Sequence, residues 1–339
     1  MSVPAADAAL LASAQSGDRA AFDRLVASHR SRLHTHCYRM LGSPHDADDA
    51  LQETLLAAWR GLPSFEGRSA LGTWLHQIGT HACLRLIAQR PWRRESPDHG
   101  PSFHSTDDLG EMVTGPVWLE PLSDDNAWGG DTSDDPATAL ARRESVALAF
   151  IAALQHLPGT QRAVLLLREV LGYSAAETAT MLDTSVTAVN SALQRAQKMM
   201  KGKAPAVTQA TELEALGDDG LQSLLGTFVG AWEARDIDAL VRLFTDDVRF
   251  TMPPLPSWFD GLGDVRRFIV ERIFASPWHL LPLQANGQPG FACYMKTEGD
   301  DRFRLAGITL LSVRGGRIAG LHSFLDPAVH RRFGLSEEI

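Results

Sequence analysis

The sequence predicts a multidomain protein: two all-α domains, the second a helix-turn-helix, followed by a C-terminal α+β cone. Apolar residues recur at helical spacing over residues 8–94 and again over 143–203. Short alternating apolar runs, typical of strands, appear within residues 218–336. Between the helical blocks, residues 95–142 are rich in Gly, Pro, Ser and Asp, which predicts a flexible linker. A chain of 339 residues is long enough for this organisation.

In the first block, the pattern predicts a helix that begins at Ser43. Ser43 is a favoured N-cap, Pro44 suits the first helical position, and Asp46 puts a carboxylate in the first turn, where the helix dipole favours anions. Apolar residues then recur every three or four positions as far as Leu62. A second helix follows the loop 65–68 and ends in a basic tail.

The second block contains the sharpest local pattern. Ser174 and Glu177 form a capping box, and a tight turn at residues 183–184 leads into a last helix capped by Ser185. Two helices joined by a short turn predict a helix-turn-helix. The inward face of the last helix is expected to carry Val186, Val189, Leu193 and Ala196.

The outward face of that helix carries hydrogen-bonding side chains, which suit base edges and phosphates. They are Thr187, Asn190, Ser191, Gln194, Arg195 and Lys198. The alternative interpretation is an ordinary solvated helix face.

In the last part of the chain, a helical hairpin over residues 221–243 precedes four strand-like runs. These runs are residues 248–252, 291–295, 305–313 and 318–324, with a hairpin turn at 314–317 between the last two. Helices followed by an antiparallel sheet predict the α+β cone.

The net charge of −9 hides an uneven distribution. Residues 95–144 carry a net charge of −10, whereas residues 1–94 and 145–203 each carry +3. Two mildly basic blocks on either side of an acidic stretch are compatible with two nucleic-acid-binding domains. An apolar island at residues 118–122 interrupts the acidic stretch, and we expect it to dock onto a neighbouring domain; an incidental patch is the alternative.

Two ordered sets of motifs resemble bacterial sigma factors of the extracytoplasmic-function class. The first set, similar to their promoter-melting domain (region 2), comprises residues 22–25, 46–54, 65–69 and 74–78. The second set, similar to the domain that reads the −35 element (region 4), comprises residues 157–158, 161–162, 172–174, 177–179 and 189–196. The C-terminal part resembles the SnoaL-like cone that is fused to some of these factors.

The resemblance implies a partner for each surface. The helix over residues 46–54 is similar to the one that docks on the clamp helices of the RNA polymerase β′ subunit, and the β subunit is a further expected contact. The side chains implied in docking are Asp46, Asp48, Asp49, Gln52 and Glu53. A solvated acidic helix start is the alternative.

The resemblance also implies contacts with promoter DNA. The loop 65–69 corresponds to the segment that holds a flipped base of the −10 element. The side chains implied there are Phe65, Arg68, His76, Gln77, Thr80 and Arg85. Phe65 has an alternative role as a core residue that closes the loop, and Trp74 is expected to pack.

The linker departs from the pattern of fused factors. Those factors often carry Trp-Leu-Pro-Glu-Pro there and a glycine-rich segment near the C-terminus. Here the linker has Trp118, Leu119, Glu120 and Pro121, and the glycine-rich segment is missing. We expect Trp118, Leu119 and Pro121 to form an interdomain latch.

Other classes of function have weaker support. Catalysis in the cone would draw on Asp260, Tyr294, His322 and Asp326, whose spacing does not show that they converge. Trp232, Trp258, Phe259 and Trp278 either line a ligand pocket or fill the core. Of His34, Cys37, His81 and Cys83, only His34 and Cys37 share a helix face, too few ligands for zinc.

The sequence is therefore interpreted as a non-catalytic initiation factor that needs no cofactor or metal and whose partners are core RNA polymerase and promoter DNA. A small-molecule ligand of the cone stays open. No apolar run reaches the length of a membrane helix, and the start does not resemble a signal peptide, so a cytoplasmic protein is expected. The alternative is a helix-turn-helix regulator with a ligand-sensing cone; a small-molecule isomerase or cyclase is a third reading.

Overall fold

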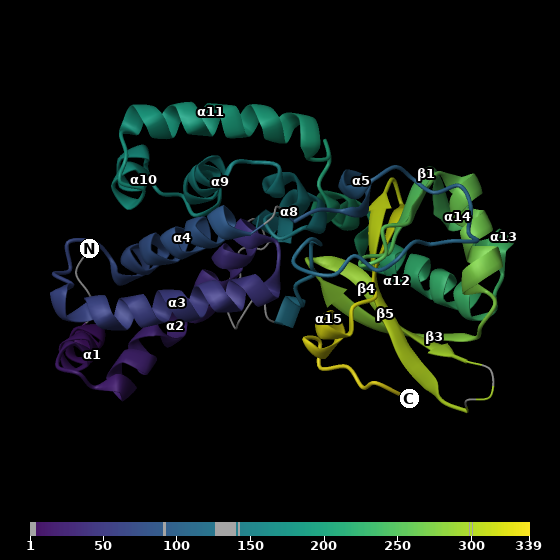
Figure 1. The fold of residues 1–339 in the computed structure, drawn as a ribbon, viewed down its shortest axis with the longest axis horizontal. Helices are drawn as coiled ribbons and strands as arrows, with labels where there is room; N and C mark the ends of the chain where they lie inside the picture. Colours follow the sequence, from purple (N-terminus) through teal and green to yellow (C-terminus); the bar gives the residue numbers. More distant parts are fainter. Residues whose placement is uncertain (1–4, 91–92, 126–139, 142, 298, 300) are drawn as a thin grey trace. The chain divides into compact units, whose positions relative to one another are not determined.

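The computed structural model describes residues 5–90, 93–125, 140–141, 143–297, 299 and 301–339. These residues form two compact units, drawn in Figure 1. Unit 1 contains the helices before residue 93 and those of residues 149–204. Unit 2 contains residues 93–124, the segment that ends at residue 148, and residues 205–339. Within the described ranges, no helix is long and apolar enough to cross a membrane.

Unit 1 begins with four helices and a 3-10 turn. They are α1 (Ala5–Gln15), α2 (Arg19–Leu41), α3 (Pro44–Gly61), η1 (Leu62–Ser64) and α4 (Leu71–Gln89). The side chain of Ser43 accepts the Asp46 N–H at 3.2 Å, with Pro44 at the first helical position, which confirms the predicted start of α3. The helices pack around apolar side chains that include Phe22, Leu33 and Leu75.

The second half of unit 1 is also helical. It comprises α8 (Leu148–Gln155), α9 (Gly159–Leu165), the π-helical turn η2 (Leu166–Val170), α10 (Ala175–Met181) and α11 (Val186–Lys203). The predicted capping box is confirmed, since Ser174 N–H donates to Glu177 at 2.8 Å and Glu177 N–H donates to the Ser174 hydroxyl at 3.2 Å. Asp183, with φ of 50°, makes the turn between α10 and α11.

One predicted inward residue of α11 is not inward. Val189 and Ala196 are buried and Leu193 is half-buried, but Val186 is 44% exposed. Val186 is the first residue of the helix, directly after the Ser185 cap, so no preceding turn of α11 covers it.

A buried arginine joins the two halves of unit 1. The Arg162 guanidinium on α9 donates to the carbonyl of Met40 at the end of α2, to the Gln155 side chain at 2.6 Å and to the Leu157 carbonyl at 3.1 Å. Burial lowers the pKa of Arg162 to about 10. Because these acceptors bond both terminal nitrogens of the buried guanidinium, Arg162 holds the start of α9 against α2.

Unit 2 begins with linker residues 93–124, which are folded against the cone, contrary to the predicted flexibility. Arg94 N–H donates to the Val117 carbonyl at 2.8 Å, and Phe103 N–H donates to the Trp258 carbonyl of the cone at 2.7 Å. A short helix, α5 (Ser96–His99), lies within this segment. The low apolar content of this segment predicted flexibility, but its few apolar residues are concentrated where they meet the cone. The rest of the predicted flexible linker, residues 126–139 and 142, lies outside the described residues.

The helices of the cone are α12 (Gln209–Glu233), α13 (Ile237–Leu243), α14 (Leu262–Phe268) with the π-helical turn η3 (Ile269–Ile273), and α15 (Pro327–Arg331). The predicted hairpin over 221–243 is present, but its first helix begins earlier, at Gln209, and bends at Gly217, whose φ is 70°.

The sheet of the cone has six strands in the order β2-β1-β6-β5-β4-β3. They are β1 (Phe244–Thr251), β2 (Trp258–Asp260), β3 (Trp278–Ala285), β4 (Gln288–Lys296), β5 (Phe303–Arg314) and β6 (Arg317–Phe324). The four predicted runs correspond to β1, β4, β5 and β6, whereas β2 and β3 were not predicted. All pairs are antiparallel except β1 and β6, which run parallel.

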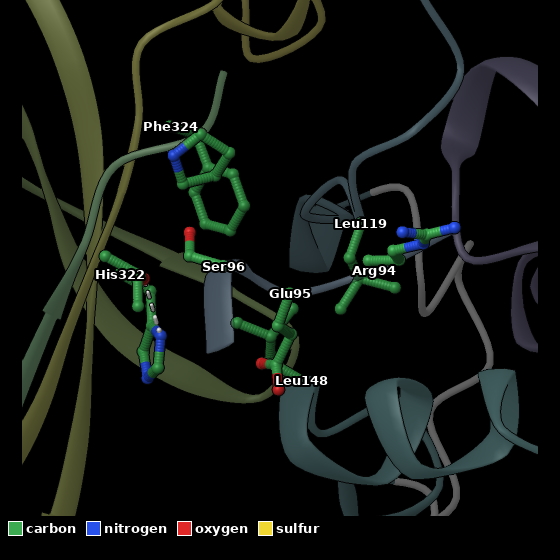
Figure 2. Close-up of a pocket in the computed structure, with 9 residues that line it drawn as sticks. Arg94, Glu95, Ser96, Leu119, Leu148, His322 and Phe324 are labelled. Atoms are coloured by element: carbon green, nitrogen blue, oxygen red, sulfur yellow. Dashed lines mark hydrogen bonds between the residues drawn. The ribbon is translucent and has the colours of Figure 1, made fainter. Parts of the chain in front are cut away.

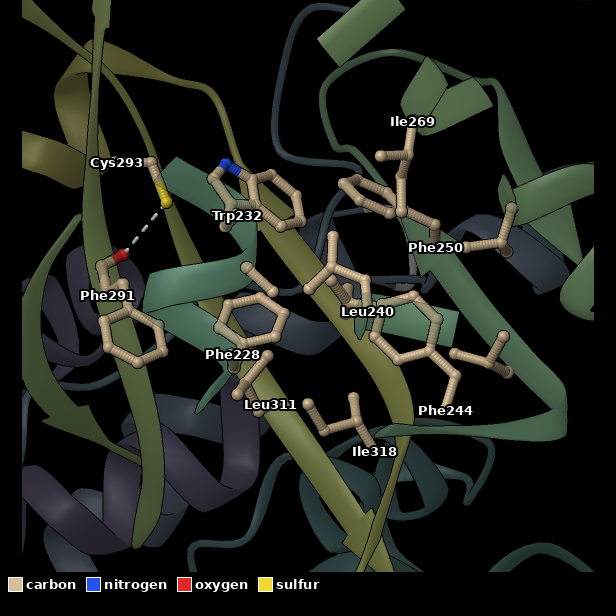
Figure 3. Close-up of a cluster of buried hydrophobic side chains, with 14 of the residues drawn as sticks. Phe228, Trp232, Leu240, Phe244, Phe250, Ile269, Phe291, Cys293, Leu311 and Ile318 are labelled. Atoms are coloured by element: carbon tan, nitrogen blue, oxygen red, sulfur yellow. Dashed lines mark hydrogen bonds between the residues drawn. The ribbon is translucent and has the colours of Figure 1, made fainter. Parts of the chain in front are cut away.

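Aromatic side chains fill the space between the helices and the inner face of the sheet (Figure 3). Phe228 stacks on Phe291 with ring centroids 5.6 Å apart, and Phe259 stacks on Phe268 at 4.4 Å. Trp232 and Phe259 belong to this buried cluster, and Trp278 packs against it. Of the aromatic residues that were expected to line a pocket or fill the core, these three therefore contribute to the core.

We predict that Gly290→Ala destabilises the cone. A Cβ at Gly290 on β4 would lie 2.6 Å from the Thr309 carbonyl oxygen of β5, too close for the strands to stay in register without a shift. The free energy of unfolding should fall by about 1–3 kcal/mol, measured by urea denaturation.

The matched control is Gly226→Ala on α12, where a Cβ would meet nothing within 4 Å. This change should raise the free energy of unfolding by about 0.5–1 kcal/mol, because alanine loses less conformational entropy in a helix. Equal effects of the two substitutions would contradict the close contact at Gly290.

Candidate nucleic-acid and polymerase interface

The outward face of α11 presents polar side chains to solvent as predicted. Thr187, Asn190, Gln194, Arg195 and Lys198 are exposed. Ser191 is half-buried. The acceptors and donors of this face therefore lie on one exposed surface of a helix held by the buried residues of its opposite face.

The acidic face of α3 is paired with basic side chains of its own unit. Asp48 lies 3.0 Å from His34, Asp49 lies 3.2 Å from Arg90, and Glu53 lies 2.5 Å from Arg85. The carboxylates of Asp48, Asp49 and Glu53 are nevertheless about half exposed, so solvent screens these ion pairs. Such exposed pairs exchange partners at little cost in free energy.

Asp46 differs from the other acidic residues of α3. Its side chain is buried, and it pairs with Arg90 at the C-terminal end of α4. The structure therefore places Asp46 in the packing between α3 and α4, while Gln52 is exposed on the outer side of α3.

Sequence reasoning missed Leu56 on the same face of α3. Leu56 is 48% exposed, and it follows Gln52 and Glu53 by four and three positions, so the three side chains are neighbours on the helix surface. The pattern carried a signal for it, because Leu56 falls outside the buried apolar stripe. An exposed leucine beside carboxylates is suited to a protein partner.

In the loop expected to hold a −10 base, the Arg68 side chain is exposed and the Phe65 side chain packs against a neighbouring ring. The Phe65 ring lies 4.8 Å from the Trp74 ring, and both side chains are half-buried. Arg68 is exposed and pairs with Glu66 at 3.1 Å. Gly67 has φ of 69°, a conformation that favours glycine.

Two of the expected DNA contacts on α4 lie inside unit 1. Thr80 is fully buried and hydrogen-bonds the His36 ring at 2.9 Å. His76 is 7% exposed, with its Nδ1 2.8 Å from the Gly72 carbonyl oxygen and 3.3 Å from the Tyr173 hydroxyl. Burial lowers the pKa of His76 to about 4, so this ring is neutral at neutral pH.

The remaining expected −10 residues lie nearer the surface of α4. Gln77 is half-buried, and Arg85 is half exposed while paired with Glu53. The structure thus brings Phe65, Arg68 and Gln77 to accessible positions and keeps His76 and Thr80 covered.

The predicted latch is buried within unit 2. Trp118, Leu119 and Pro121 are all buried. The Trp118 ring lies 5.0 Å from the His99 ring and donates from Nε1 to the Val113 carbonyl at 2.9 Å. The apolar island therefore docks inside the unit that contains the cone.

A small cavity lies where the linker meets the sheet of the cone (Figure 2). Its volume is about 10 Å³, and it is lined by Arg94, Glu95, Ser96, Leu119, Leu148, Thr251, Pro253, His322 and Phe324. Such a space holds about one water molecule. Burial, together with the neighbouring Asp98, raises the pKa of Glu95 to about 7, and Arg249 opposes the shift.

The four residues considered for catalysis are engaged separately. Asp260 pairs with Arg249 at 3.0 Å, the Tyr294 hydroxyl donates to the Ser336 carbonyl at 3.0 Å, and Asp326 caps α15. The two ring nitrogens of His322 meet the hydroxyls of Thr251 and Ser312 at 3.2 and 3.0 Å. Burial lowers the pKa of His322 to about 4.

The histidines and cysteines considered for metal binding are also engaged. His34 contacts Asp48, and the His81 ring lies 2.9 Å from the Met181 carbonyl oxygen. Cys37 and Cys83 are buried free thiols. In the part of the chain that the structure describes, no group of three or more His, Cys, Asp or Glu side chains could hold a metal ion.

Three protein-family models match the chain. They are Sigma-70 region 2 over residues 25–93, Sigma-70 region 4 over residues 147–200, and the SnoaL-like domain over residues 225–321.

Curated relatives and a solved structure agree with these models. The chain is 42% identical over 326 residues to the ECF RNA polymerase sigma factor SigG of Mycobacterium tuberculosis, covering 95% of this chain and 85% of that protein. It is 34% identical over 191 residues to SigM of the same organism, covering 56% of this chain and 81% of that protein. The crystal structure of M. tuberculosis SigJ matches with a TM-score of 0.59 and 21% identity, covering 90% of this chain and 97% of that chain, which shows the fold alone.

We predict that Glu95→Gln removes a pH dependence of stability in unit 2. Burial raises the pKa of Glu95 in the folded state to about 7, above its ordinary value of 4.5, so folding favours the protonated carboxyl. Its contribution to stability is complete below about pH 4.5 and is lost as the pH rises through 7. At pH 4, the glutamine variant and the wild type should have the same free energy of unfolding in urea titrations. At pH 8, the free energy of unfolding of the variant should be higher by about 1–3 kcal/mol.

Glu111→Gln on an exposed part of the same linker is the matched control and should leave the pH profile unchanged. A Glu95→Gln profile parallel to that of the wild type from pH 4 to 8 would refute the raised pKa.

Proposed function

Because the chain belongs to the extracytoplasmic-function sigma factors of RNA polymerase, we propose that it docks on core polymerase through α3 and reads a two-element promoter through α4 and α11. The cone modulates this activity and is not an enzyme. The observation that carries the proposal is the exposed polar face of α11 in a chain that also has the acidic, leucine-bearing face of α3.

The −35 element is read by the outward face of α11. Asn190 and Gln194 offer paired donors and acceptors to base edges, and Arg195 and Lys198 meet phosphates or guanine. The capping box at Ser174 and the turn at Asp183 support this reading, because they hold α10 and α11 at a defined angle.

Core polymerase docks on Asp48, Asp49, Gln52, Glu53 and Leu56. The half-exposed carboxylates attract basic side chains of the β′ clamp helices and raise the association rate, while Leu56 supplies apolar area to bury. Asp46 takes an indirect part, since its pair with Arg90 orients α3 on α4.

The −10 element is held first by Phe65, Arg68 and Gln77. A base that leaves the stack can replace Trp74 as the partner of the Phe65 ring, since the two rings are only half-buried. His76 contacts DNA only after Tyr173 moves away from α4, because Tyr173 lies against His76 in unit 1. Thr80 contacts DNA only after its bond to the His36 ring is broken.

The cone acts through protein contacts. Its inner face is filled by the aromatic cluster, and its four candidate acid–base residues have separate partners. We therefore assign it a modulatory role on the linker that joins the two DNA-reading parts, with the latch residues Trp118, Leu119 and Pro121 as the point of contact.

We predict that Asp48→Arg/Asp49→Arg abolishes capture of core RNA polymerase in a pull-down. The double change replaces two attractive carboxylates by positive charges that face basic clamp helices, so association should fall by at least about tenfold. The matched control is Asp218→Arg/Asp219→Arg on α12, which makes the same change of net charge on exposed residues of the cone.

If both double variants lose polymerase capture equally, the change in net charge explains the loss, and docking through α3 is contradicted. Failure of the wild type and of a chain that ends at Lys203 would favour the alternative, a helix-turn-helix regulator that binds DNA without polymerase.

We predict that Arg195→Ala weakens binding to −35 duplex DNA and lowers the salt dependence. Loss of one phosphate contact reduces the slope of log affinity against log salt by about one. Fluorescence anisotropy at several salt concentrations measures this slope, and Arg24→Ala on exposed α2 is the charge-matched control. An Arg195→Ala slope equal to that of the control places Arg195 away from phosphate.

A further inference from the structure

The first helix of unit 1 bonds the segment that leads from α3 into the loop 65–69. Gln15, the last residue of α1, donates from Nε2 to the Leu62 carbonyl at 3.2 Å and to the Phe65 carbonyl at 2.9 Å. A glutamine amide nitrogen carries two N–H donors, so one side chain can serve both carbonyls. Leu62 is the first residue of η1 and Phe65 is the residue that follows it, so these two bonds, the Gln15 anchor, span the turn.

Phe65 is the residue at which this segment passes from packed to exposed. Its N–H donates to the Leu62 carbonyl at 3.0 Å, and its backbone is extended, with φ of −74° and ψ of 108°. The residues that follow it, 66–70, are all exposed. The bond from Gln15 to the Phe65 carbonyl therefore fixes the last peptide group before the exposed part of the loop, and with it the place from which the Phe65 side chain extends.

The Phe65 ring is the surface that the proposed function gives to a base of the −10 element. This ring lies 4.8 Å from the Trp74 ring at an interplanar angle of 35°. Both side chains are only half-buried, so packing between them leaves the Phe65 ring room to turn. A selective binding site needs its side chains held to within about 0.5 Å, which requires hydrogen bonds and packing from neighbouring elements.

The helix α1 is itself held in place on unit 1. Ala14 is 2% exposed within the apolar cluster of this unit, and Leu10 packs against the same cluster. The Asp18 carboxylate caps α2 and also accepts the Ser13 hydroxyl at 2.9 Å, which ties the end of α1 to the start of α2. Gln15 therefore reaches the loop from a helix whose position is fixed by other contacts.

We propose that Gln15 is a positioning residue for promoter recognition: by bonding the backbone on both sides of η1, it holds the Phe65 ring where one unpaired base of the −10 element is selected. This inference rests on the proposed function. It gives a part in base selection to α1, which lies before residue 25, where the match to Sigma-70 region 2 begins. Gln15 acts through Phe65 and does not itself touch DNA.

The first test measures the Gln15 anchor directly, by hydrogen–deuterium exchange at the Phe65 amide of the full-length protein. Gln15→Glu keeps the size of the side chain but has no donor at neutral pH, and Gln15→Met is unbranched and carries no charge. Either change should raise exchange at this amide about tenfold, because the turn loses two hydrogen bonds. The matched control, Ala12→Glu, puts the charge of the first variant on an exposed residue one turn earlier in α1 and should leave exchange unchanged.

The second test measures base selection during transcription. Core RNA polymerase is reconstituted with the full-length protein and supplied with promoter fragments whose −10 and −35 bases are randomised. The wild type should select bases in both elements. Gln15→Glu and Gln15→Met should lower the preference at one −10 position about tenfold and leave the −35 preference unchanged, since α11 is untouched. Ala12→Glu should select the same bases as the wild type.

Four results would overturn the proposal. Unchanged exchange at Phe65 in both Gln15 variants removes the anchor, and raised exchange with an unchanged −10 preference removes its role in base selection. Loss of preference in both elements assigns the defect to a general loosening of unit 1. A defect in Gln15→Glu without one in Gln15→Met makes charge the cause in place of the hydrogen bonds.

Failure of the proposed function gives a different result. In that case the wild type yields no transcripts from the randomised fragments with core polymerase, although exchange at Phe65 still reports on the Gln15 anchor.

Discussion

The docking of an apolar linker segment on the cone is the interaction on which the organisation of unit 2 depends. Trp118, Leu119 and Leu122 lose their contact with water there, and burial of side chains of this size stabilises by about 1.5–3 kcal/mol each. That gain offsets the entropy of ordering the acidic residues around them. Burial alone would allow this segment to lie on the cone in many positions. Hydrogen bonds such as those between Asn286 and the Leu122 backbone fix one of them.

Buried polar groups join different kinds of elements in the two units. In unit 1, the buried Arg162 donates to backbone carbonyls at the end of α2 and just before α9, so its bonds align these two helices. In unit 2, Asn286 and Gln288 are buried and uncharged, and they join strands to a segment that has no regular structure. In both units, leaving a buried polar group without its partner would cost more free energy than the hydrogen bond contributes. These residues therefore favour the native arrangement over others that would break their bonds.

Local patterns predicted the helices well, because caps such as Ser43 and Ser174 act within three residues. Strand β3 escaped prediction because Pro282 lies inside it and its apolar residues do not alternate. Contacts between distant residues could not be predicted from one sequence. Leu122 and Asn286 are 164 positions apart, and no local period relates them. For the same reason, the resemblance implied a DNA contact for Thr80, whereas packing against His36 buries its side chain.

The ion pair between Glu53 and Arg85 links the two interfaces that the proposed function assigns to unit 1. Its two members belong to different expected interfaces, since Glu53 lies on the polymerase side and Arg85 on the DNA side. An exposed pair of this kind is worth at most about 1 kcal/mol, so a basic group of polymerase can take over Glu53 at little cost. Under the proposed function, that exchange would free the guanidinium of Arg85 for phosphate. Binding of either macromolecule then favours the other by the same factor, a thermodynamic coupling that one side-chain contact suffices to create.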